Sequence, residues 1–173
     1  MVDQRNELLI NSAKELELTD KLAKNLYDAG YNASNSVIVT VSTDYSSIIG
    51  QLLRHKLSFN GEMCSGFGVD VPYPDEDWNE NYVNAVMSMF KLHSDDIRGK
   101  NIILVEAGVI RGGNYTMIVD IIQRYLTLTE KIITVAMFEN INSRFKSNFV
   151  GEFYDNATQD LTFWWEEYNN HWS

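Results

Sequence analysis

A glycine-rich turn between an apolar run and a helical pattern is the part of this sequence best suited to chemistry. Residues 102–105 have the apolar composition of a strand buried on both faces, and the acid Glu106 follows them. The turn at residues 109–114 comes next, and apolar residues at helical spacing begin at Tyr115. Backbone N–H groups at the start of a helix, together with the helix dipole, bind anions and most often phosphate. The sequence therefore predicts a phosphate site at this turn.

Six consecutive residues are candidates for contact with the phosphate. The glycines lack a Cβ, so a ligand can approach their backbone closely. The arginine supplies positive charge and paired donors that suit phosphate oxygens. The alternative is a turn that only reverses the direction of the chain. The candidates are Arg111, Gly112, Gly113, Asn114, Tyr115 and Thr116.

The rest of the chain predicts an α/β fold that would position this turn. Three apolar runs, at residues 37–41, 102–106 and 132–138, alternate with helical patterns. Such alternation calls for a mainly parallel central sheet flanked by helices, with right-handed crossovers. We expect the three runs to lie side by side in the core of this sheet.

Other segments are assigned from their apolar spacing. The pattern over residues 8–26 predicts helix, with a division into two helices at Thr19 as an option, and residues 48–57 predict a further helix. Residues 62–71 are expected to be extended. Residues 83–90 are apolar enough to be assigned as a strand.

Length and composition restrict the class of protein. The 173 residues suit one domain, and 45% hydrophobic and 22% charged residues are ordinary for a soluble protein. A net charge of −10 argues against a protein that mainly binds nucleic acid or an anionic membrane. Cys64 is the only cysteine, which excludes an intrachain disulfide and a cysteine metal cluster. With no long apolar run and no signal-peptide pattern, a cytoplasmic protein is expected.

The order of these segments resembles the type I phosphoribosyltransferases of the purine branch over most of the chain. Residues 95–106 are similar to the approach to that family's signature, and the aromatic residues 162–166 are similar to the tail of its xanthine/guanine enzymes. The resemblance implies a phosphoribosyltransferase-like domain over residues 1–173 with a small extended hood. It also implies Trp164 as a residue that stacks on a base, with burial in the core as the alternative.

The signature motif departs from the family pattern at several positions. In the family, two acids at the strand end hold the ribose hydroxyls and Mg²⁺, and a third acid in the turn lies near the reacting carbon. Glu106 matches the first acid, so the resemblance implies a ribose or Mg²⁺ contact there, against a solvated carboxylate at a strand end. Ala107 replaces the second acid, and the turn carries no third acid. Asp44 stands in the expected pyrophosphate loop, and Glu139 stands where the family often has a lysine.

These departures favour a protein that binds a phosphorylated ribose or nucleotide with weak or lost transferase activity. One alternative is an active, divergent purine phosphoribosyltransferase that converts phosphoribosyl pyrophosphate (PRPP) and a base to a nucleotide and pyrophosphate. A second alternative is a non-catalytic interaction or regulatory protein on the same fold. The expected partner is a small phosphorylated ligand, a nucleotide or PRPP, and the sequence is compatible with a homodimer.

Overall fold

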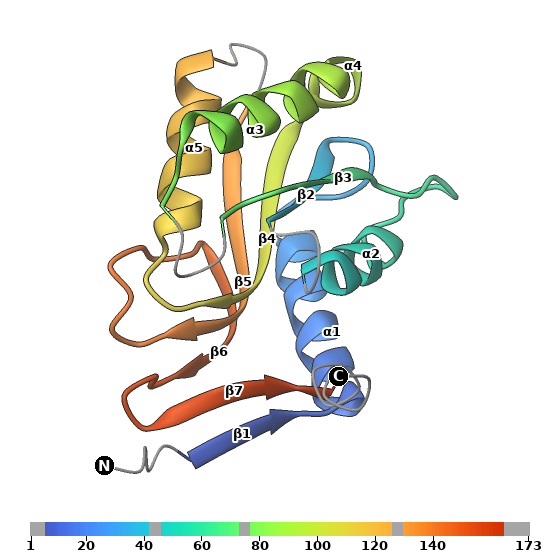
Figure 1. Cartoon of the computed structure of the whole chain (residues 1–173). Coiled ribbons are helices and arrows are strands. Elements are labelled where there is room, and N and C mark those ends of the chain that lie inside the picture. The colour runs from blue at the N-terminus through green and yellow to red at the C-terminus, as the bar shows by residue number, and fades with distance from the viewer. Residues whose placement is uncertain (1–5, 42–45, 73–76, 126–129, 165–173) are drawn as a thin grey trace, which may run out of the picture.

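A five-stranded parallel sheet in the order β3-β2-β4-β5-β6 runs through the centre of the molecule (Figure 1). The computed structural model describes residues 6–41, 46–72, 77–125 and 130–164. In chain order the elements are β1 (Asn6–Ile10), α1 (Ser12–Asp28), β2 (Ser36–Val41), α2 (Ser46–Lys56), β3 (Ser65–Val69), α3 (Glu80–Leu92), α4 (Ser94–Ile97), β4 (Asn101–Val109), α5 (Gly113–Tyr125), β5 (Ile132–Asn140), β6 (Phe149–Tyr154) and β7 (Gln159–Phe163). The predicted neighbours β2, β4 and β5 are adjacent, which confirms that expectation.

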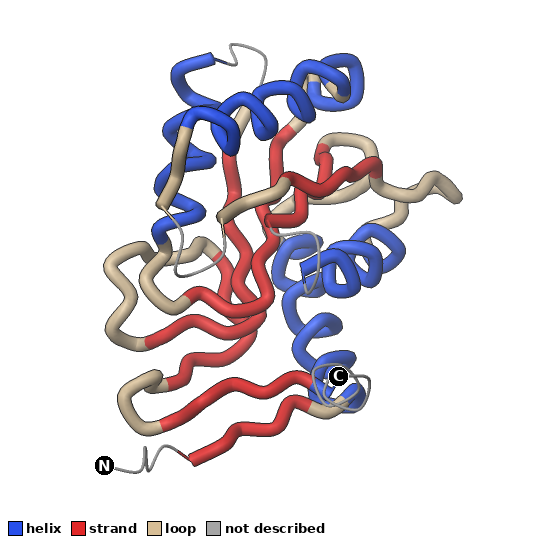
Figure 2. Tube along the Cα trace, in the orientation of Figure 1, coloured by secondary structure: helices blue, strands red, loops and turns tan. Residues whose placement is uncertain are grey.

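Helices cover both faces of this sheet (Figure 2). On one face, α1 and α2 bury residues such as Leu22 and Leu53 against Ile103 of β4. On the other face, α3 and α5 bury residues such as Phe90 and Ile118. Because β2 and the first half of β4 are covered on both faces, their sequences are continuous apolar runs rather than alternating ones.

The two ends of the described chain form a small separate sheet. Strands β1 and β7 pair in parallel beyond β6, and this pair is the hood (Figure 1). The segment at residues 62–71 is extended as expected, and it contributes β3, the edge strand of the main sheet. The prediction of helix at Leu8 was wrong because β1 occupies that stretch. Helix α1 begins after Asn11, whose side chain accepts from the N–H of Lys14, and it continues unbroken through Thr19.

The assignment of residues 83–90 as a strand was also wrong. They belong to α3, which begins after Asn79, whose side chain accepts from the N–H groups of Asn81 and Tyr82. Val86 and Phe90 are four residues apart and both are buried, so the apolar side chains follow the helical period. None of the helices in the described part of the chain is long and apolar enough to cross a membrane.

Candidate functional site

The glycine turn lies at the carboxyl end of the central strand β4. This strand continues three residues past Glu106 and pairs with β5 as far as Val109 and Glu139. Glu106 therefore lies within the strand, whereas the sequence predicted that it would be the last residue of the strand. The turn proper is Ile110, Arg111 and Gly112, and α5 begins at Gly113.

Gly112, in the turn, and Gly113, the first residue of α5, have different surroundings. Gly112 is buried and has φ +78°, a left-handed conformation that side chains disfavour. A Cβ on Gly112 would lie 2.2 Å from the Cβ of Phe145, so the turn packs directly against the chain between β5 and β6. Gly113 is exposed, and a Cβ there would meet nothing within 4 Å. Open space therefore lies in front of the first residue of α5.

The amino end of α5 presents three backbone N–H groups. The N–H of Thr116 already donates to the carbonyl of Gly112 at 3.1 Å, and the Thr116 hydroxyl donates to the same oxygen at 3.0 Å. The N–H groups that helix geometry leaves without an intrahelical acceptor are thus those of Gly113, Asn114 and Tyr115. These three N–H groups are the ones that the predicted phosphate nest would use, because the N–H of Thr116 is already bonded to Gly112.

Tyr115 anchors the helix to the sheet. Its side chain is fully buried, its hydroxyl donates to the carbonyl of Val135, and its ring lies 5.2 Å from that of Phe145. Burial raises its pKa well above the usual value, and the nearby Glu106 adds to the effect. The whole residue is 0% exposed, so its hydroxyl is out of reach of a ligand, and of the three residues of the nest Gly113 is the exposed one. Arg111 is also exposed.

Glu106 and Asn114 are joined directly. The side-chain amide of Asn114 donates to Oε1 of Glu106 at 3.2 Å, and the indole N–H of Trp78 donates to Oδ1 of Asn114 at 3.3 Å. Oε2 of Glu106 is buried and has no hydrogen-bond partner among the described residues. Burial raises the pKa of Glu106 to about 7, although the hydrogen bond from Asn114 opposes this. Near neutral pH the carboxyl group is therefore in part protonated.

The described residues around Glu106 do not fit a magnesium ion. Mg²⁺ takes oxygen ligands in octahedral arrangement, whereas one oxygen of Glu106 is occupied by Asn114 and the next residue is Ala107 rather than a second acid. Ala107 belongs to the apolar cluster on the α1 and α2 side of the sheet, and its N–H donates to Oγ of Ser46 at 3.1 Å. No group of three metal-ligating side chains occurs among the residues described.

Trp164 lies directly after β7 and is tied to α1. Its indole N–H donates to Oε2 of Glu15 at 2.8 Å, and Glu15 is only 3% exposed. Burial raises the pKa of Glu15, and the bond from Trp164 lowers it. The predicted stacking of Trp164 on a base stays a prediction.

Other residues near the turn were not found from the sequence. Asn140 donates to the carbonyl of Ile110 at 3.1 Å and so ties the end of β5 to the turn. Trp78 lies 36 residues before its partner Asn114, and Phe145 lies 33 residues after Gly112, so no local spacing reveals them. Glu139 lies buried within β5. Asp44 lies outside the described residues.

Comparison with known proteins identifies the architecture. No family model and no curated protein matches the chain. Among solved structures, a purine phosphoribosyltransferase from Pyrococcus horikoshii Ot3 has a TM-score of 0.66 at 12% identity, with 92% of this chain and 93% of that chain covered. The xanthine-guanine-hypoxanthine phosphoribosyltransferase of Helicobacter pylori has a TM-score of 0.68 at 12% identity, covering 96% and 97%.

The fold is that of the purine phosphoribosyltransferases. The same phosphoribosyltransferase fold is found in a hypothetical protein from Neisseria gonorrhoeae with bound ppGpp, at a TM-score of 0.67, 12% identity and coverage of 96% and 95%. At this identity the likeness establishes the fold, and any activity has to be argued from the site.

Proposed function

We propose that this protein binds a phosphorylated ribose or nucleotide, with a phosphate group on the amino end of α5. The observation that carries the proposal is the set of three N–H groups at Gly113, Asn114 and Tyr115, directly after the central strand and facing open space at Gly113. Ligands of parallel α/β sheets bind at the carboxyl ends of the strands, and helix amino ends favour anions. Arg111 adds positive charge at the same turn.

Glu106 is the group that would meet the sugar. Oε2 of Glu106 has no partner among the described residues but is buried, so a ribose hydroxyl reaches it when the Asn114 side chain that bonds Oε1 moves aside. The structure with bound ppGpp supports this choice of ligand, because ppGpp is a guanine nucleotide that carries several phosphate groups. Such ligands are cytoplasmic metabolites, so we also place the protein in the cytoplasm.

We expect phosphoribosyl transfer to be absent or very slow. The transition state develops positive charge on the ribose and negative charge on the leaving pyrophosphate, and both need fixed complementary groups. Ala107 is apolar and belongs to the apolar cluster on the α1 and α2 side of the sheet. Glu106 is in part protonated near neutral pH and so carries less than a full negative charge. Loss of one such group costs roughly 10²–10³ in rate, so the combined losses leave little activity.

Calorimetry with purified protein tests the binding. We expect GMP, IMP, AMP or ribose 5-phosphate to bind at millimolar concentration or below, whereas the corresponding nucleosides do not. Absence of binding by every phosphorylated compound would contradict the proposal and favour an interaction or regulatory role for the fold.

A direct assay separates binding from catalysis. The protein is incubated with Mg²⁺, PRPP and hypoxanthine, guanine, xanthine or adenine, and released pyrophosphate is measured. Turnover near one per second with any base would establish the alternative of an active, divergent phosphoribosyltransferase.

A further inference from the structure

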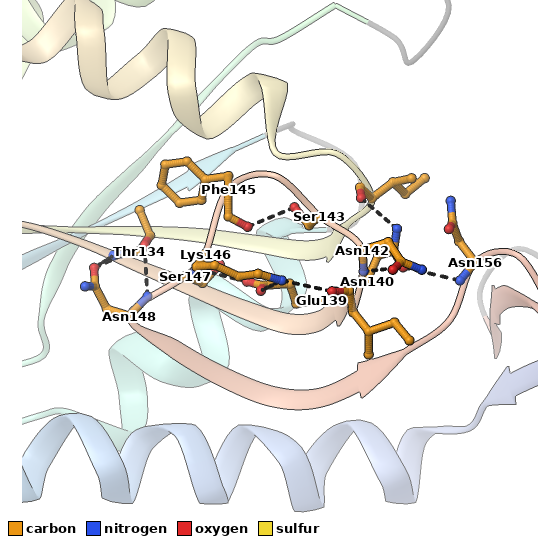
Figure 3. A network of polar contacts seen from close by, with 12 residues as sticks. Thr134, Glu139, Asn140, Asn142, Ser143, Phe145, Lys146, Ser147, Asn148 and Asn156 are labelled. Carbon is orange, nitrogen blue, oxygen red and sulfur yellow. Dashed lines mark hydrogen bonds and ion pairs between the residues drawn. The ribbon is translucent and has the colours of Figure 1, made fainter.

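The loop between β5 and β6, residues 141–148, is held in place by a buried carboxylate (Figure 3). Glu139 is 1% exposed, its Oε2 accepts from the N–H of Ser147 at 2.8 Å, and its Oε1 lies 3.5 Å from Nζ of Lys146. Lys146 also donates to the carbonyl of Ile141 at 3.1 Å, so it spans the loop from one side to the other. The ammonium group of Lys146 therefore has its partners within the protein.

The same loop is held against the turn at residues 110–112 in two places. Asn140 donates to the carbonyl of Ile110, and its Oδ1 accepts from the N–H of Asn142 at 3.2 Å. A Cβ on Gly112 would lie 3.3 Å from the Cα of Phe145, so the backbones of the turn and the loop are in contact. The loop is therefore held in a defined position beside the amino end of α5.

An arginine directly precedes each of the two residues in this contact. Arg111 directly precedes Gly112, and Arg144 directly precedes Phe145. Both are exposed, and neither forms an ion pair with a residue that the structure describes. In a chain with 24 acidic and 14 basic residues, two exposed arginines that flank one contact and form no ion pair with a described residue are complementary to an anion from outside the protein.

We infer that Arg144 recognises a second phosphate group of the ligand, so that the site prefers a nucleotide with an additional phosphate over a nucleoside monophosphate. The inference rests on the proposed function, in which the first phosphate lies on the N–H groups of α5. Arg144 acts as a second cation of the site, in addition to Arg111. Guanidinium groups suit this role because they donate paired hydrogen bonds to phosphate oxygens.

Calorimetric titration with GMP and with ppGpp tests the inference. We expect wild type to bind ppGpp more tightly than GMP. Arg144→Gln should weaken ppGpp roughly tenfold to a hundredfold, the value of one charged hydrogen-bonded contact, and leave GMP within about twofold. Arg144→Lys should restore part of the loss. Arg98→Gln is the matched control, because it removes the same charge beyond α4, at the amino end of β4.

The outcomes separate the two proposals. Equal losses for Arg144→Gln and Arg98→Gln, or equal affinity of wild type for GMP and ppGpp, would overturn the role of Arg144 while the nucleotide site stands. Failure of wild type to bind either nucleotide would overturn the proposed function and this inference with it.

Discussion

The side-chain amide of Asn114 donates to Glu106 at 3.2 Å, so the first turn of α5 covers the carboxyl group of the central strand. Trp78 holds the other end of the Asn114 amide at 3.3 Å. Because the two bonds use both the donor and the acceptor of one side chain, Asn114 is fixed in orientation. Glu106 and the proposed phosphate nest are thus linked through Asn114.

The raised pKa of Glu106 makes stability depend on pH. Its pKa is about 7 in the folded protein against an ordinary value of 4.5, so between these values the folded state holds a proton that the unfolded state releases. Stability therefore falls as pH rises through this range, by an amount on the order of 2–3 kcal/mol. In denaturant titrations at several pH values, the unfolding free energy of Glu106→Gln should therefore fall less over this pH range than that of wild type. Parallel curves for the two proteins would contradict the prediction.

Removal of the Asn114 side chain should raise the pKa of Glu106 further. The hydrogen bond from Asn114 stabilises the ionised form, so Asn114→Ala leaves burial unopposed. Carbon NMR of the Glu106 carboxyl group during a pH titration measures the change. Asn156→Ala, in the turn before β7, serves as the control and should leave the pKa of Glu106 in place. A pKa of Glu106 that stays the same or falls in Asn114→Ala would show that the bond does not form in solution.

Gly112→Ala should destabilise the protein more than Gly99→Ala. Both glycines have positive φ, at +78° and +67°, so each substitution pays a backbone cost of roughly 1–2 kcal/mol. A Cβ on Gly99 meets nothing within 4 Å, whereas a Cβ on Gly112 would collide with Phe145. The collision adds roughly 1–3 kcal/mol. Equal unfolding free energies for the two variants would mean that the turn and the loop are not packed as described.

Ala107→Asp should destabilise the protein rather than restore a transferase site. Ala107 is 4% exposed and lies among apolar residues of α1, α2 and the sheet, where the described surroundings offer a carboxylate no cation. The expected loss of stability is about 3 kcal/mol or more. Ala13→Asp, at an exposed position in the first turn of α1, should change stability little. Pyrophosphate release by a stable Ala107→Asp protein would contradict this account.

The strands of the core could be predicted because burial on both faces leaves a continuous apolar run, as in β2 and β4. Residues 83–90 carry a similar number of apolar side chains, and only the spacing of Val83, Val86 and Phe90 distinguishes a helix from a strand. The strand β1 was missed because it is stabilised by pairing with β7, about 150 residues later.

The position of the candidate site was predictable, but the arrangement within it was not. A strand, a glycine turn and a helix start are local features, and they located the nest at Gly113. The burial of Glu106 depends on the tertiary positions of Asn114 and Trp78, and the collision at Gly112 depends on Phe145. Such contacts between distant segments leave no local signal in one sequence.

Amide NMR of the α5 amino end tests the central claim most directly. On titration of GMP into the labelled protein, we expect the largest shifts at the N–H groups of Gly113, Asn114 and Tyr115. Gly113→Val should abolish them, because its side chain fills the open space in front of the helix. Gln123→Val, a β-branched substitution at an exposed position near the other end of the same helix, should preserve them. Saturable shifts that lie elsewhere, or that persist in Gly113→Val, would contradict a phosphate site at the start of α5.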